Sequence, residues 1–243
     1  MPRVELLVMV LVIYRAIFGD YDNIPLSLPK NLRSDIRCVL LTDTPVASED
    51  WEVIQIDTQN PVLANRHCKM FPWEYFKADK SLYLDGHIEF GDDFANFLDD
   101  LCQSNDDFSA MRHREGGIVA DELNRNIANS KLSRKQLKKI FLAGLNLTST
   151  SVECGLLFRN HSVATVKEHA VRWWWYFNNV CPRDQLSVNT AADEVSMKVS
   201  VLEETFANRN YFKLVGHKNA RIKVLRTRLT KALRVLVNGL ILD

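Results

Sequence analysis

Short, nearly continuous apolar runs recur along the first half of the chain, and each is followed by an acidic residue or an acidic loop. The runs cover residues 4–13, 36–42, 51–56 and 82–84. The acidic residues after them are Asp20 and Asp22, then Asp43, Asp57 and Asp85. Uninterrupted hydrophobicity over a few residues is typical of parallel strands that are buried on both faces. This pattern restricts the chain to folds in which helices cover both faces of a sheet.

Helical segments separate the predicted strands. They cover residues 65–76, 92–101, 119–129, 133–145 and 163–178, and further short strands are predicted over 108–111 and 153–158. Pro72 breaks the first helix, whereas Ser133 is a suitable N-cap for the fourth. Strands that alternate with helices predict an α/β fold with a mostly parallel central sheet flanked by helices. We expect one such domain over residues 1–217.

The composition is that of an ordinary globular protein. The chain has 243 residues, 47% of them hydrophobic, and a formal net charge of +1. This charge gives no reason to expect a nucleic acid as partner. The five cysteines are widely spaced and form no C-x-x-C motif. Such cysteines disfavour a disulfide framework and a structural zinc site, and they favour a reducing, cytoplasmic location.

Two terminal segments raise the question of membrane contact. The run at 4–13 is too short to span a bilayer. It has the length of a signal-peptide core, but Glu5 interrupts its start and no small-residue cleavage site follows, so we favour a strand. Residues 218–243 are predicted to form a basic amphipathic helix. This helix could lie on an anionic membrane surface, pack on the domain, or lead into a further domain or partner.

Residues 80–90 hold the first candidate site. Asp85 and His87 lie two apart around Gly86. In an extended segment such residues point to the same side, so a carboxylate and an imidazole could share one divalent cation. The alternative is that Asp85 only closes a turn. A later histidine, His217, could complete the metal site or be an ordinary surface or core residue.

The other strand ends extend this candidate site. The carboxyl ends of parallel strands meet along one edge, where ligand crevices form, so Asp22, Asp43 and Asp85 are expected close together. Arg66 and Lys69 share a predicted helix face and could neutralise a diphosphate there, or simply be solvated. The glycine motifs of dinucleotide-binding and P-loop proteins are absent from the sequence. The sequence therefore still allows a site in which acidic strand ends, a metal and two cations hold a nucleotide.

A second group of candidates follows the predicted helix 163–178. Asp184 comes after Pro182 at the end of this helix. It could act as a general base, or it could cap a turn. Three consecutive tryptophans at 173–175 cover more than one helix face. One of them could therefore be a platform for a sugar ring, while the others pack in the core.

Short segments of the chain resemble, in the same order, those of a known family. They are residues 16–22, 41–43, 66–69, 83–88, 113–114, 153–155 with Arg159 and His161, 173–174 and 183–187. The resemblance covers roughly residues 14–190. The chain resembles nucleotide-sugar glycosyltransferases of the GT-A fold. More narrowly, it is similar to the glycosyltransferase-like domain, formerly of unknown function, of plant cell-wall proteins and bacterial surface-polysaccharide clusters.

The resemblance implies a GT-A-like fold and an activity. The enzyme would move a hexose or deoxyhexose from a nucleotide-diphosphate donor, most often a UDP-sugar, to a hydroxyl of a glycan or glycoconjugate acceptor. It would use Mn²⁺ or Mg²⁺, with Asp85, His87 and His217 as candidate ligands. The Asp-x-Asp of the general pattern is Asp-Gly-His here. The second ligand could therefore be His87, a water or His217.

The resemblance also implies roles for other positions. The donor would contact Phe18, Asp20, Tyr21, Asp43, Arg66, Lys69, Asp85 and Gly86. The sugar and the acceptor would contact His113, Arg114, Trp174, Arg183 and Gln185. If the reaction inverts the anomeric centre, the expected base is Asp184, followed by Glu153 or the pair Asp121 and Glu122. A retaining reaction requires no such base.

Two other functions fit the sequence. A non-catalytic sugar- or nucleotide-binding protein could keep the same fold. A metal-dependent phosphoesterase or nucleotidyltransferase would also use acidic strand ends and a metal. Two-metal sites of that kind need a denser cluster of carboxylates than the sequence offers, which makes this alternative the weaker one.

Overall fold

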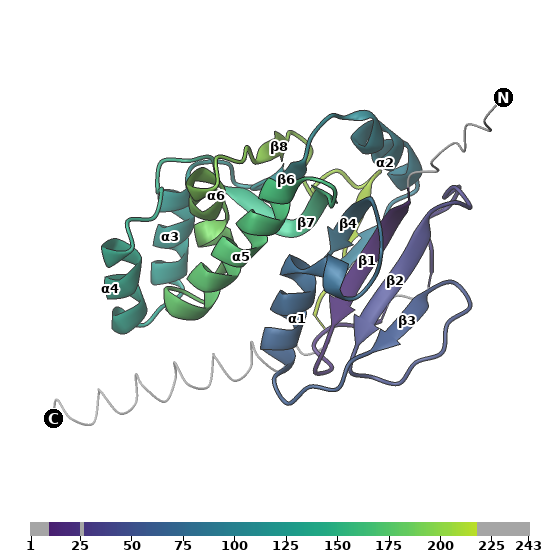
Figure 1. Ribbon diagram of the computed structural model, residues 1–243, viewed down its shortest axis with the longest axis horizontal. Coiled ribbons are helices and arrows are strands. Elements are labelled where there is room, and N and C mark those ends of the chain that lie inside the picture. Colours follow the sequence, from purple (N-terminus) through teal and green to yellow (C-terminus); the bar gives the residue numbers. More distant parts are fainter. Residues whose placement is uncertain (1–9, 25–26, 218–243) are drawn as a thin grey trace, which may run out of the picture.

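A seven-stranded sheet forms the centre of the protein in the computed structural model, which describes residues 10–24 and 27–217 (Figure 1). The strand order is β3-β2-β1-β4-β7-β6-β8. The strands are β1 (Leu11–Ile17), β2 (Arg37–Thr42), β3 (Glu52–Gln55), β4 (Lys80–Leu84), β6 (Phe108–Arg112), β7 (Val152–Asn160) and β8 (Ser200–Leu202). Only β7 runs antiparallel to its neighbours among these described strands, so the expected mostly parallel α/β sheet is confirmed.

Helices cover both faces of this sheet. Alternate residues of β1 point to opposite faces, as strand geometry requires. One face packs against α1 (Pro61–Met70), α3 (Val119–Ala128), α4 (Arg134–Leu142), α5 (Ala164–Asn179) and α6 (Asp184–Glu194). The other face packs against α2 (Phe94–Gln103) and a small antiparallel pair, β5 (Ile88–Phe90) and β9 (Phe212–Leu214). The fold therefore has two hydrophobic cores with the sheet between them.

The first strand lies further along the chain than the apolar run predicts. It begins at Leu11 and continues through Ile17, and all seven of its residues are buried. Residues 4–9 lie outside the described part of the chain. The charged Arg15 makes the end of this strand look polar in the sequence, yet its guanidinium lies 4.7 Å from the Phe90 ring centroid and is fully buried.

Local signals account for most helix ends. Asn60 caps α1 by accepting a hydrogen bond from the Leu63 backbone N–H at 3.1 Å, so this helix begins before residue 65. Pro72 then separates α1 from a short 3-10 helix, Pro72–Glu74, which confirms the predicted break. Ser133 caps α4 as expected, in a reciprocal capping box with Gln136.

Helix α6 was not predicted, and its position corrects the expectation for Asp184. This residue is the first of α6 rather than the end of the tryptophan helix. Leu186 through Ala192 are all buried, so α6 has almost no polar face. A helix that is buried all round lacks the 3.6-residue periodicity by which amphipathic helices are recognised.

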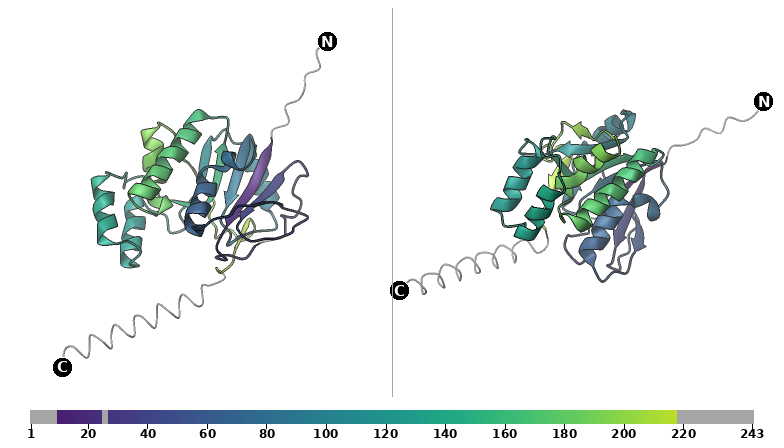
Figure 2. Two further views of the ribbon diagram at one scale, coloured as in Figure 1. Left: turned by 60° about the horizontal axis from the view of Figure 1, so that its bottom comes forward. Right: turned by 60° about the vertical axis from the view of Figure 1, so that its left-hand side comes forward.

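The helices α3 and α4 form a hairpin that projects at one end of the described fold, with α4 outermost (Figures 1 and 2). The predicted basic helix at 218–243 lies outside the described residues. Within the described ranges, the structure contains no helix with the length and apolar character needed to cross a bilayer.

Candidate functional site

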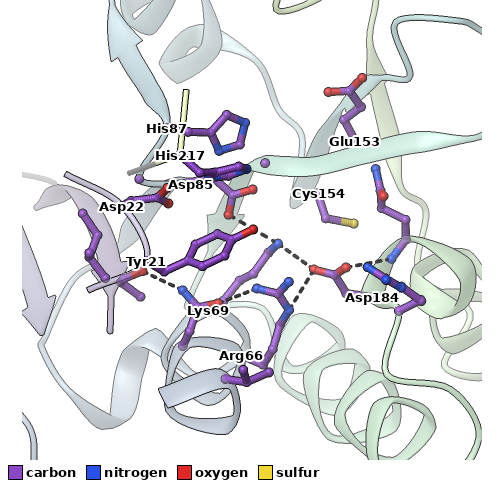
Figure 3. A pocket seen from close by; sticks show the side chains of 18 of the residues that line it. Tyr21, Asp22, Arg66, Lys69, Asp85, His87, Glu153, Cys154, Asp184 and His217 are labelled. Atoms are coloured by element: carbon purple, nitrogen blue, oxygen red, sulfur yellow. Dashed lines mark hydrogen bonds and ion pairs between the residues drawn. The ribbon is translucent and has the colours of Figure 1, made fainter. Parts of the chain in front are cut away.

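A cavity of about 650 Å³ opens where β1 and β4 end. Its walls come from the loop after β1, from α1, from the turn after β4, from β7 and from the start of α6 (Figure 3). Most of the residues singled out from the sequence line it. They are Phe18, Tyr21, Arg66, Lys69, Asp85, Gly86, His87, Arg114, Glu153, Arg183, Asp184, Gln185 and His217. Segments spread over most of the chain thus meet at one cavity.

Asp22, His87 and His217 form a candidate metal site on one wall of this cavity. One ligand atom from each residue lies within 4.8 Å of the other two. His217 Nδ1 is 2.5 Å from Asp22 Oδ1, and the rings of His87 and His217 are 4.8 Å apart. This is the one such group of three found among the described residues. Two imidazoles and a carboxylate suit a transition-metal ion better than Mg²⁺, which prefers oxygen ligands.

Gly86 makes this grouping sterically feasible. A Cβ added at this position would lie 2.7 Å from Asp22 Oδ2 and 2.9 Å from Asp22 Cβ. Contacts this short do not occur, so any larger residue would push Asp22 away from His87. The glycine between Asp85 and His87 therefore allows the loop after β1 to approach the turn after β4.

Asp85 lies beside this metal group in a tight turn rather than in an extended segment. Its backbone carbonyl accepts a hydrogen bond from the Ile88 N–H at 3.0 Å, as in the alternative reading of the motif. Its carboxylate also has specific partners, because Oδ1 accepts from the Tyr83 hydroxyl at 2.7 Å. Burial raises the pKa of the Asp85 carboxyl, but Lys69 and Arg66 outweigh this effect and hold the pKa below its usual value.

Lys69 is the buried cation at the centre of the cavity wall. Its side chain is 2% exposed, and its Nζ donates to Asp184 Oδ2 at 2.7 Å and lies 3.8 Å from Asp85 Oδ1. Arg66 Nε is 3.5 Å from the same oxygen of Asp184. Burial raises the pKa of Asp184, but Arg66 and Lys69 hold it well below its ordinary value. A carboxylate with such a low pKa is a weak general base.

Glu153 forms an ion pair with Arg114. Its Oε1 accepts from Arg114 Nε at 2.7 Å and from the Arg114 backbone N–H at 3.0 Å, and its Oε2 accepts from Nη2 at 3.1 Å. The Glu153 side chain is almost fully buried, whereas that of Arg114 is half exposed. Such a bidentate pair holds the guanidinium in a fixed direction at the cavity.

Four of the residues expected to contact the donor, the sugar or the acceptor do not line the cavity. Asp43 accepts from the Gly19 backbone N–H at 2.9 Å and so holds the loop after β1 in place. Trp174 is partly buried between α5 and α1, where it stacks on Phe177 at 5.9 Å and contacts the His67 ring at 5.1 Å. Asp20 is an exposed loop residue with a φ of 53°. The fourth residue, His113, is buried and lies 3.5 Å from Glu122, which does line the cavity.

Several lining residues were not assigned a site role from the sequence. Asp22 was expected at this edge of the sheet, but not as a metal ligand. Asn126 and Lys131 line the cavity from the α3–α4 hairpin, beside the candidate base Glu122. No local motif marks them, because they reach the cavity only through the packing of α3 against the sheet.

Comparisons with known proteins give a distant likeness. No protein-family model and no curated protein matches the chain. The glycosyltransferase GlyE of Streptococcus pneumoniae TIGR4 is similar at 14% identity with a TM-score of 0.40, over 80% of this chain and 46% of GlyE. The galactosyltransferase LgtC, solved with donor and acceptor sugar analogues, is similar at 13% identity with a TM-score of 0.41, over 81% of this chain and 74% of LgtC. The chain thus spans less than half the length of GlyE.

Proposed function

We propose that this protein is a metal-dependent glycosyltransferase that uses a nucleotide-diphosphate sugar, with a UDP-sugar as the first candidate. One observation carries the proposal. In a single cavity, a group of two imidazoles and a carboxylate lies next to buried cations on α1. A diphosphate carries charge that both a divalent cation and cationic side chains stabilise, and this cavity combines a candidate cation site with cationic side chains.

We assign each group of cavity residues a role in this reaction. Asp22, His87 and His217 would hold the metal, with Asp85 beside them. When bound, the metal supplies a Lewis acid that stabilises the leaving diphosphate. Arg66 and Lys69 bind phosphate oxygens, and Asp184 keeps both cations in position. Tyr21, whose ring centroid lies 4.6 Å from that of His217, offers an aromatic face on which the nucleobase of the donor would stack.

We infer that Asp184 is a positioning group rather than the first choice of base. Its low pKa and its two cationic partners make it a positioning group for Arg66 and Lys69. The acceptor would lie at the other end of the cavity, between Arg114, Arg183 and Gln185. Glu153 would orient Arg114 there through its bidentate ion pair.

Calorimetric titration of UDP with and without Mn²⁺ tests the proposal. We expect Mn²⁺ to increase UDP affinity at least tenfold, and Mg²⁺ to do less because two of the ligands are imidazoles. Asp22→Asn and His217→Gln should remove the Mn²⁺ effect. The matched controls are Asp50→Asn, at an exposed position, and His67→Gln, at a half-buried one, because neither residue lines the cavity.

Product analysis separates the proposal from its alternatives. A glycosyltransferase releases an intact nucleoside diphosphate from the sugar nucleotide, which phosphorus NMR detects. Cleavage between the phosphates would instead indicate a phosphoesterase or nucleotidyltransferase. Metal-dependent binding without turnover of any sugar nucleotide would indicate a binding protein. If neither Mn²⁺ nor His217→Gln changes the affinity for UDP, the proposed metal site is contradicted.

A further inference from the structure

The α3–α4 hairpin carries an excess of basic residues, although the whole chain has nearly equal numbers of basic and acidic residues. Between Glu122 and Glu153 the sequence contains no aspartate or glutamate. The same interval contains Arg125, Lys131, Arg134, Lys135, Lys138 and Lys139. The whole chain has 31 basic and 30 acidic residues, so this segment departs strongly from the average. The charge is thus gathered on one projecting unit of the fold.

The structure displays most of this charge on the outside of the hairpin. Arg134, Lys135 and Lys138 are exposed, and none of them forms an ion pair with another residue in the described ranges. Lys139 is also exposed, and its Nζ donates to the Asn179 carbonyl at 2.7 Å. Arg125, by contrast, is paired with Glu115 and Glu122 and does not contribute.

Large apolar side chains lie next to these cations. Phe141 and Leu142, in the last turn of α4, are 66% and 77% exposed. The inner face of the helix is already used, because Ile140 is buried in the core and Leu137 packs against that core. The outward position of α4 at the end of the fold leaves its outer face uncovered within the described structure (Figures 1 and 2). Two large exposed apolar side chains therefore lie beside the exposed cations of the same helix.

We propose that the outer face of α4 docks on an anionic membrane surface. Lysines and arginines attract the acidic headgroups, and each of them near the bilayer surface adds to the binding free energy. Phe141 and Leu142 insert at the headgroup boundary. A nucleic acid would also attract the cations, but its phosphate backbone offers nothing for two apolar side chains to enter. The combination of charge and exposed apolar side chains therefore favours a lipid surface.

Sedimentation of the full chain with vesicles tests this docking surface. We expect binding to vesicles of phosphatidylcholine with 30% phosphatidylglycerol and little binding to phosphatidylcholine alone. The variant Lys135→Glu/Lys138→Glu should weaken binding by at least about tenfold, because it replaces two attractive charges by two repulsive ones. The variant Lys77→Glu/Lys198→Glu changes the same charge at two other exposed positions and is the matched control.

A local probe makes the result independent of other basic segments. A Leu142→Cys variant carries an environment-sensitive maleimide dye, and Lys77→Cys carries the same dye as a control. Brominated lipids should quench the dye at 142 and leave the dye at 77 bright. The proposal is overturned if the dye at 142 is not quenched, or if both charge-reversal variants bind anionic vesicles alike. Binding to single-stranded DNA but not to vesicles would also overturn it.

Discussion

The two faces of the central sheet each bury a cationic side chain, and they stabilise it in different ways. On the cavity face, Lys69 is paired with Asp184 and lies close to Asp85. On the opposite face, Arg15 has no carboxylate partner within residues 10–24 and 27–217. Its guanidinium lies over Phe90 and Trp51, and Nη1 donates to the Asp85 carbonyl at 3.3 Å. Its Nε and Nη2 have no hydrogen-bond partner among the described residues.

This difference separates a binding group from a supporting one. The partners of Lys69 line a cavity, so an incoming anion can compete with them. The partners of Arg15 are aromatic rings and a backbone carbonyl, which no ligand replaces. Burial lowers the pKa of Arg15 to about 10, but the side chain stays charged at neutral pH. We therefore expect substitutions at the two cations to have different effects on stability and on binding.

Among the single substitutions, the largest effect is expected for Lys69→Met. This change leaves the buried Asp184 with Arg66 alone, and breaking a buried ion pair costs about 3 to 5 kcal/mol. Urea unfolding measures the loss, and UDP titration should show no binding. The double variant Lys69→Met/Asp184→Leu removes both charges and should regain most of the stability without regaining binding. Equal stability of the single and double variants would contradict the ion-pair account.

A second prediction concerns two histidines that are buried in the neutral form. Burial lowers the pKa of both His161 and His169 to about 4, from an ordinary value of 6.5. The unfolded chain therefore binds more protons than the native protein between pH 6.5 and 4. Stability should be complete above pH 6.5 and fall as the pH drops to 4, by about 3 kcal/mol per histidine.

Urea unfolding at several pH values measures this loss. The variant His161→Gln/His169→Gln should show a flatter curve between pH 6.5 and 4, even if its stability at pH 7 is lower. An unchanged slope would show that other groups cause the acid sensitivity. The Asp184 carboxyl, with its lowered pKa, stabilises the fold above its ordinary pKa and loses this effect only at lower pH, so the two windows are separable.

A smaller effect on stability is expected for Gly86→Ala. The new methyl group would meet the Asp22 carboxylate, which can turn away from it at a cost of about 1 to 2 kcal/mol. Because Asp22 then leaves His87 and His217, the affinity for Mn²⁺ should fall at least tenfold. Gly144→Ala, at a position with no neighbour within 4 Å but with a φ of +62°, is a control for backbone strain alone. Unchanged Mn²⁺ affinity in Gly86→Ala would argue against Asp22 as a ligand.

The smallest effect is expected for Arg15→Met. No carboxylate loses its partner, and a methionine fills much of the same space between the rings, so stability should change by less than about 1.5 kcal/mol. UDP affinity should fall only a few-fold, since the hydrogen bond to the Asp85 carbonyl is lost. A destabilisation as large as that of Lys69→Met would show that the aromatic contacts stabilise Arg15 as strongly as an ion pair.

The fold was largely predictable because its signals are local. The apolar runs at 36–42 and 51–56 became β2 and β3, and Ser133 caps α4 as its type and position predict. Failures occurred where burial removes periodicity or where a charge is buried. Helix α6 is buried on nearly all sides, and Arg15 lies inside β1. The pair β5 and β9 was also missed, because each strand is three residues long and its partner is far along the chain.

The candidate site shows the same division. The sequence by itself determined which side chains follow the buried strands, as Asp85 follows β4, and placed Arg66 and Lys69 on one helix, because these relations span only a few residues. Only the tertiary structure decided that Asp22 meets His217, 195 positions away, and that Asp184 joins Lys69, 115 positions away. Contacts over such distances depend on how whole elements pack, and local propensities carry no information about that packing.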